Sequence, residues 1–249
     1  YTEYCMPCHG VKGDGKGVSS KGLTVPPRDF TKGLYKFGRV EAGGLPRDED
    51  FYRIIKEGLH GTAMIPWDMG KGQMRAVVQY LKTFAPDVWE GKDKTLGKPI
   101  IPVKDPYGIA RKESGIERGK EVYHVLGECQ TCHRGYISKD EFVRMYKKNN
   151  GSLPDFDDTF YQIKLQESEY GHMTVPPDFT WHEVRSTQTV EDLFVRISAG
   201  VGGTSMPGWQ DTLEDDDIWA VAYYVKSLME KKGKMDAVRE INNVQGVGR

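Results

Sequence analysis

The stretch CMPCH at residues 5–9 returns as CQTCH at residues 129–133, 124 positions further along the chain. The 249 residues include four cysteines, and these two stretches contain all of them, namely Cys5, Cys8, Cys129 and Cys132. In each stretch the thiols are three residues apart and a histidine, His9 or His133, follows directly. One chemistry, used twice, therefore accounts for every cysteine in the chain.

Three kinds of site use cysteines at this spacing. A zinc site needs four ligands on one ion, and it has no role for a histidine directly after each pair. A thioredoxin-like redox pair belongs in a βαβ pattern, which is not found here. Haem attachment uses every residue, because two thiols one helical turn apart can bond both vinyl groups of one porphyrin while the histidine binds its iron. The pattern predicts two covalent c-type haems, with zinc or a disulfide as the weaker alternative.

The remainder of the chain also repeats. Four blocks follow each CxxCH in the same order: TVPPRDF (24–30) and TVPPDF (174–179), EDFYRII (49–55) and EDLFVRI (191–197), GTAMIPW (61–67) and GTSMPGW (203–209), and RAVVQYLK (75–82) and WAVAYYVK (219–226). A repeat of this length indicates that one domain is used twice.

The third block of each copy contains a methionine, Met64 or Met206, 15 residues after the equivalent glutamate. A thioether opposite the histidine closes the sixth position of the iron and raises its reduction potential. An isolated methionine beside a tryptophan more often only packs, but equivalence in both copies favours ligation. Met64 and Met206 are therefore predicted as iron ligands, whereas Met69, Met74 and Met173 lack equivalents and are assigned to packing or the surface.

These blocks make the sequence resemble a dihaem c-type cytochrome with two class I cytochrome c domains, as in the cytochrome c4 type and the haem subunits of bacterial respiratory complexes. The resemblance covers nearly the whole chain. It implies an all-α fold, two haem c groups with their iron, and electron transport as the activity. It also implies that a carbonyl from Pro26-Pro27 or Pro176-Pro177 accepts the other N–H of the proximal histidine.

The expected order of parts is a first cytochrome c domain over residues 1–84, an extended proline-containing linker over 85–115, a second domain over 116–229 and a polar tail over 230–249. The second domain carries an insertion around residues 141–170, which is interpreted as a docking surface, a lid over a haem edge, or filler, with docking favoured. Helical spacing predicts helices over residues 49–57, 72–84, 116–123, 191–199 and 213–229.

Charge and hydropathy limit the partners. The net charge of −1 argues against a nucleic-acid binder. The sequence contains no run of about 18 apolar residues, so a membrane-spanning helix is not predicted. Residues 1–98 carry a charge of +4 and residues 99–249 a charge of −5, which suits either redox partners of different kinds or mutual attraction of the halves. A leader is expected to precede residue 1. Together with haem attachment, this predicts the bacterial periplasm or the outer face of the cytoplasmic membrane.

The predicted function is electron transfer through two His/Met haems, by a carrier or by the cytochrome subunit of a respiratory oxidoreductase, without catalytic residues of its own. The alternatives are a dihaem peroxidase and a gas sensor, and both need an iron with an open position. A thiosulfate-oxidising cytochrome would be expected to use a further cysteine, which the chain lacks. His60 lies four residues before Met64, but its counterpart is Gly202, so ligation by His60 is not predicted.

Overall fold

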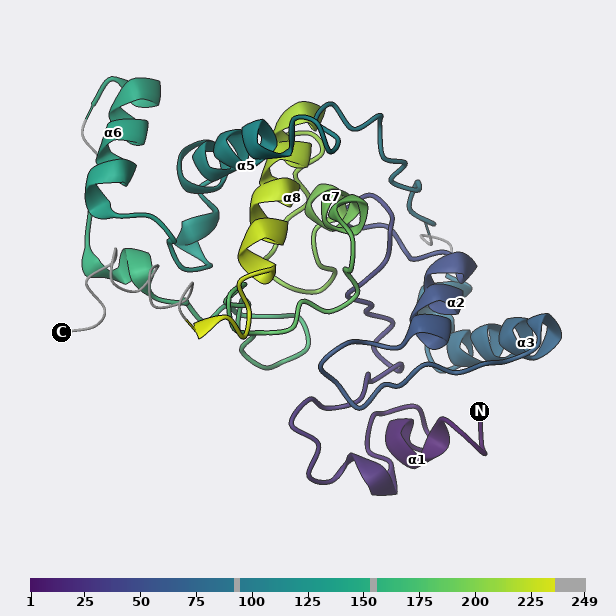
Figure 1. Ribbon diagram of the computed structural model, residues 1–249. Coiled ribbons are helices and arrows are strands. Elements are labelled where there is room, and N and C mark those ends of the chain that lie inside the picture. The colour runs from purple at the N-terminus through teal and green to yellow at the C-terminus, as the bar shows by residue number, and fades with distance from the viewer. Residues whose placement is uncertain (92–94, 153–155, 236–249) are drawn as a thin grey trace.

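A computed structural model of the chain describes residues 1–91, 95–152 and 156–235, and Figure 1 shows its helices in two groups. The first group, at the lower right of the figure, contains α1 (Met6–His9), α2 (Asp48–Glu57) and α3 (Lys71–Lys82), and α4 (Pro86–Trp89) follows α3. The second group contains α5 (Lys112–Glu121), α6 (Lys139–Asn150), α7 (Val190–Ala199) and α8 (Asp215–Met229).

Short helical turns complete the structure: the 3₁₀ turns η1 (Val18–Ser20), η3 (Cys129–Thr131) and η4 (Asp158–Tyr161), and the π-helical turn η2 (Val122–Leu126). Among the described residues, β-structure is limited to isolated bridges. The all-α prediction is therefore confirmed.

The helices α2 and α7 occupy equivalent places in the two groups, and carboxylates cap the start of both. The Asp50 carboxylate in α2 accepts hydrogen bonds from the backbone N–H groups of Arg39 (2.8 Å) and Arg47 (2.9 Å). Before α7, the Thr189 hydroxyl accepts from the N–H of Asp192 at 3.0 Å, and the Asp192 carboxylate accepts from the N–H of Thr189 at 3.1 Å. The bonds from Arg47, Asp192 and Thr189 satisfy backbone donors that a helix leaves free at its first turn, whereas the bond from Arg39 ties an earlier loop to α2.

Each group has its own hydrophobic core. In the first, Phe51 and Ile55 of α2 meet Val78 and Leu81 of α3. The second core is larger, because α7 and α8 are buried along most of their length, from Leu193 to Ala199 and from Ile218 to Val225. A helix that is apolar on nearly every side must be covered on every side. The helix α5 and the first domain supply that cover.

The helix α7 forms part of the contact between the two domains. The buried Arg196 of α7 donates hydrogen bonds to the carbonyl oxygens of Lys36 (3.4 Å), Gly38 (3.1 Å) and Gly200 (3.0 Å). An ion pair joins Arg39 of the first domain to Asp192 of the second at 2.8 Å. The Arg196 guanidinium is buried and the Arg39–Asp192 ion pair is partly buried. Separation of the domains would therefore break hydrogen bonds made by charged groups that are shielded from water.

Residues 85–115, which were predicted as an extended linker, begin with α4, and Trp89 of α4 is buried in the first core. Beyond this helix the chain runs beside the first domain, where the N–H of Gly97 donates to the carbonyl of Leu45 at 3.0 Å. Ile100 then enters the second core, and α5 begins at Lys112, four residues before the predicted helix. Residues 92–94 of this segment lie outside the described residues.

The insertion predicted around residues 141–170 forms α6 and a small core of its own. Phe142 and Phe160 pack there against Val125 and Ile137. Figure 1 shows α6 at the far left, remote from the first domain, whereas Tyr170 at the end of the insertion lies against Arg28 of the first domain. Residues 153–155 of the insertion and 236–249 of the predicted tail lie outside the described residues.

Replacement of Gly119 by alanine is expected to destabilise the second domain. At Gly119 the helix α5 crosses α8 so closely that a Cβ atom would lie 2.0 Å from the carbonyl oxygen of Ala220. The helices would have to move apart, so we expect the free energy of unfolding to fall by roughly 1–3 kcal/mol in denaturant titrations. Gly72→Ala in α3 is the matched control, because nothing lies within 4 Å of that position. Equal stability of the two variants would contradict this account of the crossing.

Candidate haem sites

The first CxxCH stretch lies on the short helix α1. Cys5 stands directly before the helix, whereas Cys8 and His9 lie within it, and the N–H of His9 donates to the carbonyl of Cys5 at 2.8 Å. The glycine-rich loop that follows folds back onto this helix, where the N–H of Gly15 donates to the His9 carbonyl (2.9 Å) and that of Gly17 to the Cys8 carbonyl (3.1 Å). The loop therefore holds the haem-attachment motif in place.

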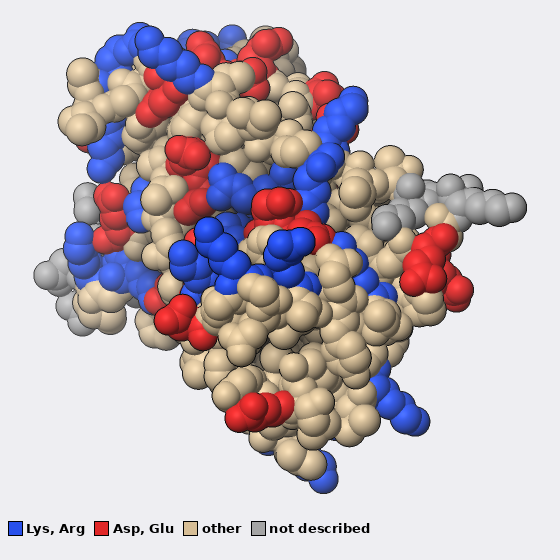
Figure 2. All heavy atoms as spheres, turned by 90° about the vertical axis from the view of Figure 1, so that its right-hand side faces the viewer, with Lys and Arg blue, Asp and Glu red and all other residues tan. Residues whose placement is uncertain are grey.

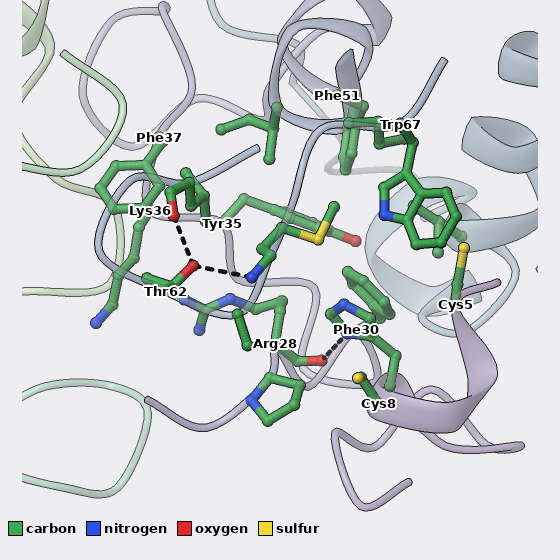
Figure 3. Close-up of a pocket in the computed structure, with 18 of the residues that line it drawn as sticks. Cys5, Cys8, Arg28, Phe30, Tyr35, Lys36, Phe37, Phe51, Thr62 and Trp67 are labelled. Carbon is green, nitrogen blue, oxygen red and sulfur yellow. Dashed lines mark hydrogen bonds between the residues drawn. The ribbon is translucent and has the colours of Figure 1, made fainter. Parts of the chain in front are cut away.

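A cavity of about 340 Å³ opens beside α1. Its walls include all four residues predicted for the first haem, namely Cys5, Cys8, His9 and Met64. Most of the remaining wall is apolar, and Figure 3 shows Phe30, Tyr35, Phe51 and Trp67 around it. Two thiols, an imidazole and a thioether thus share one apolar cavity, as a covalently bound porphyrin with an axial histidine and methionine requires. The residues present fit a haem c group.

A hydrogen bond and a stacked ring fix the orientation of the His9 imidazole. Its Nδ1 lies 3.0 Å from the carbonyl oxygen of Arg28, and its ring stacks on Phe30 with 4.6 Å between ring centroids. Since the carbonyl can only accept, Nδ1 carries the proton and Nε2 remains available to a metal. Burial lowers the pKa of His9 and so favours the neutral imidazole that metal binding needs.

The second site repeats this arrangement. Nδ1 of His133 lies 3.1 Å from the carbonyl oxygen of Pro177, and its ring stacks on Phe179 with 4.8 Å between centroids. Burial lowers the pKa of His133 as well. Cys129 and Met206 both pack against the second core, and Cys129 and Cys132 are each partly buried. Burial raises the pKa of the Cys129 thiol to about 12.

The predicted carbonyl acceptors for the histidine N–H groups are correct in one domain and wrong in the other. Pro177 supplies the carbonyl in the second domain, but in the first domain it comes from Arg28, the residue after the proline pair. In both domains the carbonyl belongs to the second residue before the stacked phenylalanine. The first loop has one more residue between its prolines and that phenylalanine, so distance from the ring decides which carbonyl reaches the histidine.

The two methionine loops have the same hydrogen bonds. The Met64 carbonyl accepts from the N–H of Leu59 at 2.8 Å, and the Met206 carbonyl accepts from the N–H of Val201 at 3.1 Å. The N–H of each methionine also donates to a threonine two residues earlier, at 3.1 Å to Thr62 and 3.3 Å to Thr204. Figure 3 shows Thr62 in this role at the wall of the first cavity.

A glycine lets each methionine loop turn back toward its helix. Gly58 after α2 has φ 71° and Gly200 after α7 has φ 70°. A Cβ atom on Gly58 would also lie 2.6 Å from the Met64 carbonyl oxygen, and one on Gly200 would lie 2.7 Å from that of Met206. Residues other than glycine are therefore excluded at both positions, because the positive φ disfavours a Cβ atom and the nearby carbonyl oxygen leaves no room for one. We did not identify these glycines, or the stacking role of Phe30 and Phe179, from the sequence, although both phenylalanines end a repeated block.

The other metal chemistry considered for the cysteines finds no support among the described residues. All four cysteines are free thiols, and no group of three or more His, Cys, Asp or Glu side chains in the described ranges is placed to hold a metal ion. The described ranges therefore do not show the side-chain groupings that a shared zinc site or a disulfide would need. A c-type haem needs no such grouping, since its attachment uses each CxxCH separately.

The four remaining histidines lie outside the first cavity wall. His60 is exposed. His124 is fully buried, with Nδ1 2.8 Å from the Lys120 carbonyl oxygen and Nε2 accepting from the N–H of Tyr136 at 3.1 Å. Nδ1 of His182 accepts from the N–H of Asp178 at 2.9 Å. His172 is exposed and accepts, through its carbonyl, from Ser168.

Comparison with known proteins agrees with this description. A tandem pair of cytochrome c domains is the class that the fold and the two sites define. The family model described as "Cytochrome C oxidase, cbb3-type, subunit III" matches residues 1–81 and 114–225. The chain belongs to this family of cytochrome c domains, which implies covalently bound haem c and haem-based electron transfer.

A solved structure has a similar fold over most of its length. It is a chain of the Kuenenia stuttgartiensis reducing HAO-like protein complex Kustc0457/Kustc0458, with 33% sequence identity and a TM-score of 0.69. The match covers 92% of this chain and 93% of that chain. Among curated proteins, no match was found.

Proposed function

We propose that the chain binds two haem c groups, each with one histidine and one methionine on the iron, and transfers electrons between them and to protein partners. His9 and Met64 bind the first iron and His133 and Met206 the second, with thioether bonds from Cys5 and Cys8 or from Cys129 and Cys132. The observation that carries this proposal is the matched geometry of the two halves, in which carbonyl, histidine, phenylalanine and methionine loop recur together.

The residues of the chain set the conditions for this activity. When bound, the haem iron supplies a one-electron step. The carbonyls of Arg28 and Pro177 fix the orientation of the histidines, and the hydroxyls of Thr62 and Thr204 fix the methionine loops by accepting hydrogen bonds from the methionine N–H groups. Because the residues suited to hold a haem recur in both halves, with a methionine placed to close each iron, we assign the chain an electron-transfer role.

We further propose that the chain is the cytochrome subunit of a redox complex, in the bacterial periplasm or on the outer face of the cytoplasmic membrane. Two comparisons support a subunit role, because the family is named for an oxidase subunit and the similar solved structure is part of a complex. No helix among the described residues is long and apolar enough to span a membrane.

The surface of the first domain suits a protein partner. The face in Figure 2 carries Lys and Arg together with Asp and Glu across its middle, with few charges on the part below, which belongs to the first domain. At the rim of the first cavity, Tyr4 is 50% exposed and Ile65 is 56% exposed. Exposed apolar side chains at the rim of the cavity suit the close contact that a redox partner needs.

Carbon monoxide binding to the fully reduced protein tests the ligation. We expect the optical spectrum to stay unchanged, because a methionine closes the sixth position of both irons. A change in half of the haem absorbance would contradict the proposal and would favour a dihaem peroxidase or a gas sensor with one open iron. A change in all of it would show that neither methionine is bound.

A further inference from the structure

Three cations lie together where the first cavity meets the second domain. Arg28 and Lys36 belong to the first domain and Arg185 to the second, and all three line the cavity that contains His9. Tyr170 of the second domain covers the first two, with its ring centroid 4.1 Å from the Arg28 guanidinium carbon and 4.8 Å from the Lys36 nitrogen. Residues from both domains therefore form this end of the first haem cavity.

These cations lack the partners that others at the interface have. Arg39 pairs with Asp192, and carbonyl oxygens surround Arg196. In the described part of the chain, by contrast, the ion pairs include none to Arg28, Lys36 or Arg185. The nearby Asp29 carboxylate accepts hydrogen bonds from Thr31 instead.

Burial, together with repulsion from the two arginines, lowers the pKa of Lys36 to about 8. Like charges held together against an apolar cavity are unfavourable unless an anion lies between them. Among the described residues no carboxylate forms an ion pair with these three cations, and a bound group with carboxylates would supply that partner.

The cysteines decide which edge of a porphyrin faces these cations. In Figure 3, Cys5 and Cys8 lie at one end of the cavity, and the side chains of Arg28 and Lys36 lie at the other. The vinyl groups of the porphyrin bond the cysteines, and its two propionates lie on the opposite edge of the ring. Covalent attachment therefore directs both carboxylates toward the cationic end.

We propose that Arg185 of the second domain, together with Arg28 and Lys36, binds the propionates of the first haem, so that the second domain completes the first haem site. This rests on the proposed function, because it requires a haem bound through Cys5 and Cys8. The interface between the domains is then partly a haem-binding site, and the charge that the second domain places there affects the potential of the first haem.

The residue after Arg185 has an unfavourable backbone conformation. Ser186 has φ 61°, in the left-handed region that residues other than glycine seldom adopt, so its backbone is strained. Its carbonyl accepts a hydrogen bond from the Arg53 guanidinium of the first domain at 3.4 Å. This strained turn directs the neighbouring Arg185 across the interface. The strain is therefore found beside a side chain that would bind the propionates.

The test is the reduction potential of each haem in Arg185→Gln. Loss of a cation near the propionates favours the oxidised iron, which carries one more positive charge, so the potential of the first haem should fall. We expect the ratio of oxidised to reduced first haem at a fixed electrode potential to rise by about tenfold, which corresponds to about 59 mV for one electron. The first haem is identified as the one whose potential changes in Met64→Ala.

Two further variants keep the result interpretable. Arg144→Gln removes the same charge from an exposed position on α6 and should leave both potentials unchanged. Arg185→Lys keeps the charge and should restore most of the potential of the first haem. Potentials in Arg185→Gln equal to those in Arg144→Gln would overturn the inference. In that case two haems that are closed to carbon monoxide would still support the proposed function, so the two failures are distinguishable.

Discussion

A chain with both Cys129 and Cys132 replaced by alanine is expected to retain one covalently bound haem where the unaltered chain has two. The thioether bonds are the covalent link, and Cys5 and Cys8 remain in a domain with a core of its own. Alanine is chosen because Cys129 packs against the second core, where a serine hydroxyl would be buried without a partner. The mass of the intact, denatured chain measures the number of haems that remain.

The reciprocal variant is the control for this count. Replacement of Cys5 and Cys8 by alanine should also leave one haem, and the optical spectra of the two variants should add to that of the unaltered chain. Two haems retained in either variant would show that the altered cysteines do not attach a haem. A single haem in the unaltered chain would contradict the proposal for one of the two domains.

The motif and the repeat could be predicted from the sequence because their chemistry is local. Attachment needs two thiols and a histidine within five residues, and the structure places Cys5, Cys8 and His9 around one short helix. The helices α2 and α7 begin within one residue of the predicted positions, because their carboxylate caps lie beside their first turns.

Contacts between distant segments could not be predicted in this way. Arg185 reaches the first cavity from more than 150 residues beyond Arg28, and no periodic pattern in the sequence connects the two. Trp89 falls in the segment that was assigned to a linker because it contains several prolines and no clear periodicity, yet the short helix α4 buries it in the first core. The Arg28 carbonyl was missed because one additional residue shifts the loop.

Replacement of Met64 or Met206 by alanine is expected to lower the reduction potential of one haem by on the order of 0.1 V, because loss of the thioether stabilises the oxidised iron. The same haem should then bind carbon monoxide when reduced, since its sixth position is open. Spectroelectrochemical titration measures the potential, and the optical spectrum under carbon monoxide measures the open fraction. Each single variant should affect one haem and leave the other near its original potential.

Met69→Ala is the matched control in the first domain. Met69 packs against the same core five residues after Met64, but it is not part of the cavity wall. Loss of packing alone would therefore affect stability in both variants, whereas loss of an iron ligand would open the haem in Met64→Ala only. If Met64→Ala keeps both potentials and stays closed to carbon monoxide, the ligand assignment is wrong. Its loop would then only pack against the haem, and another side chain would have to close the first iron.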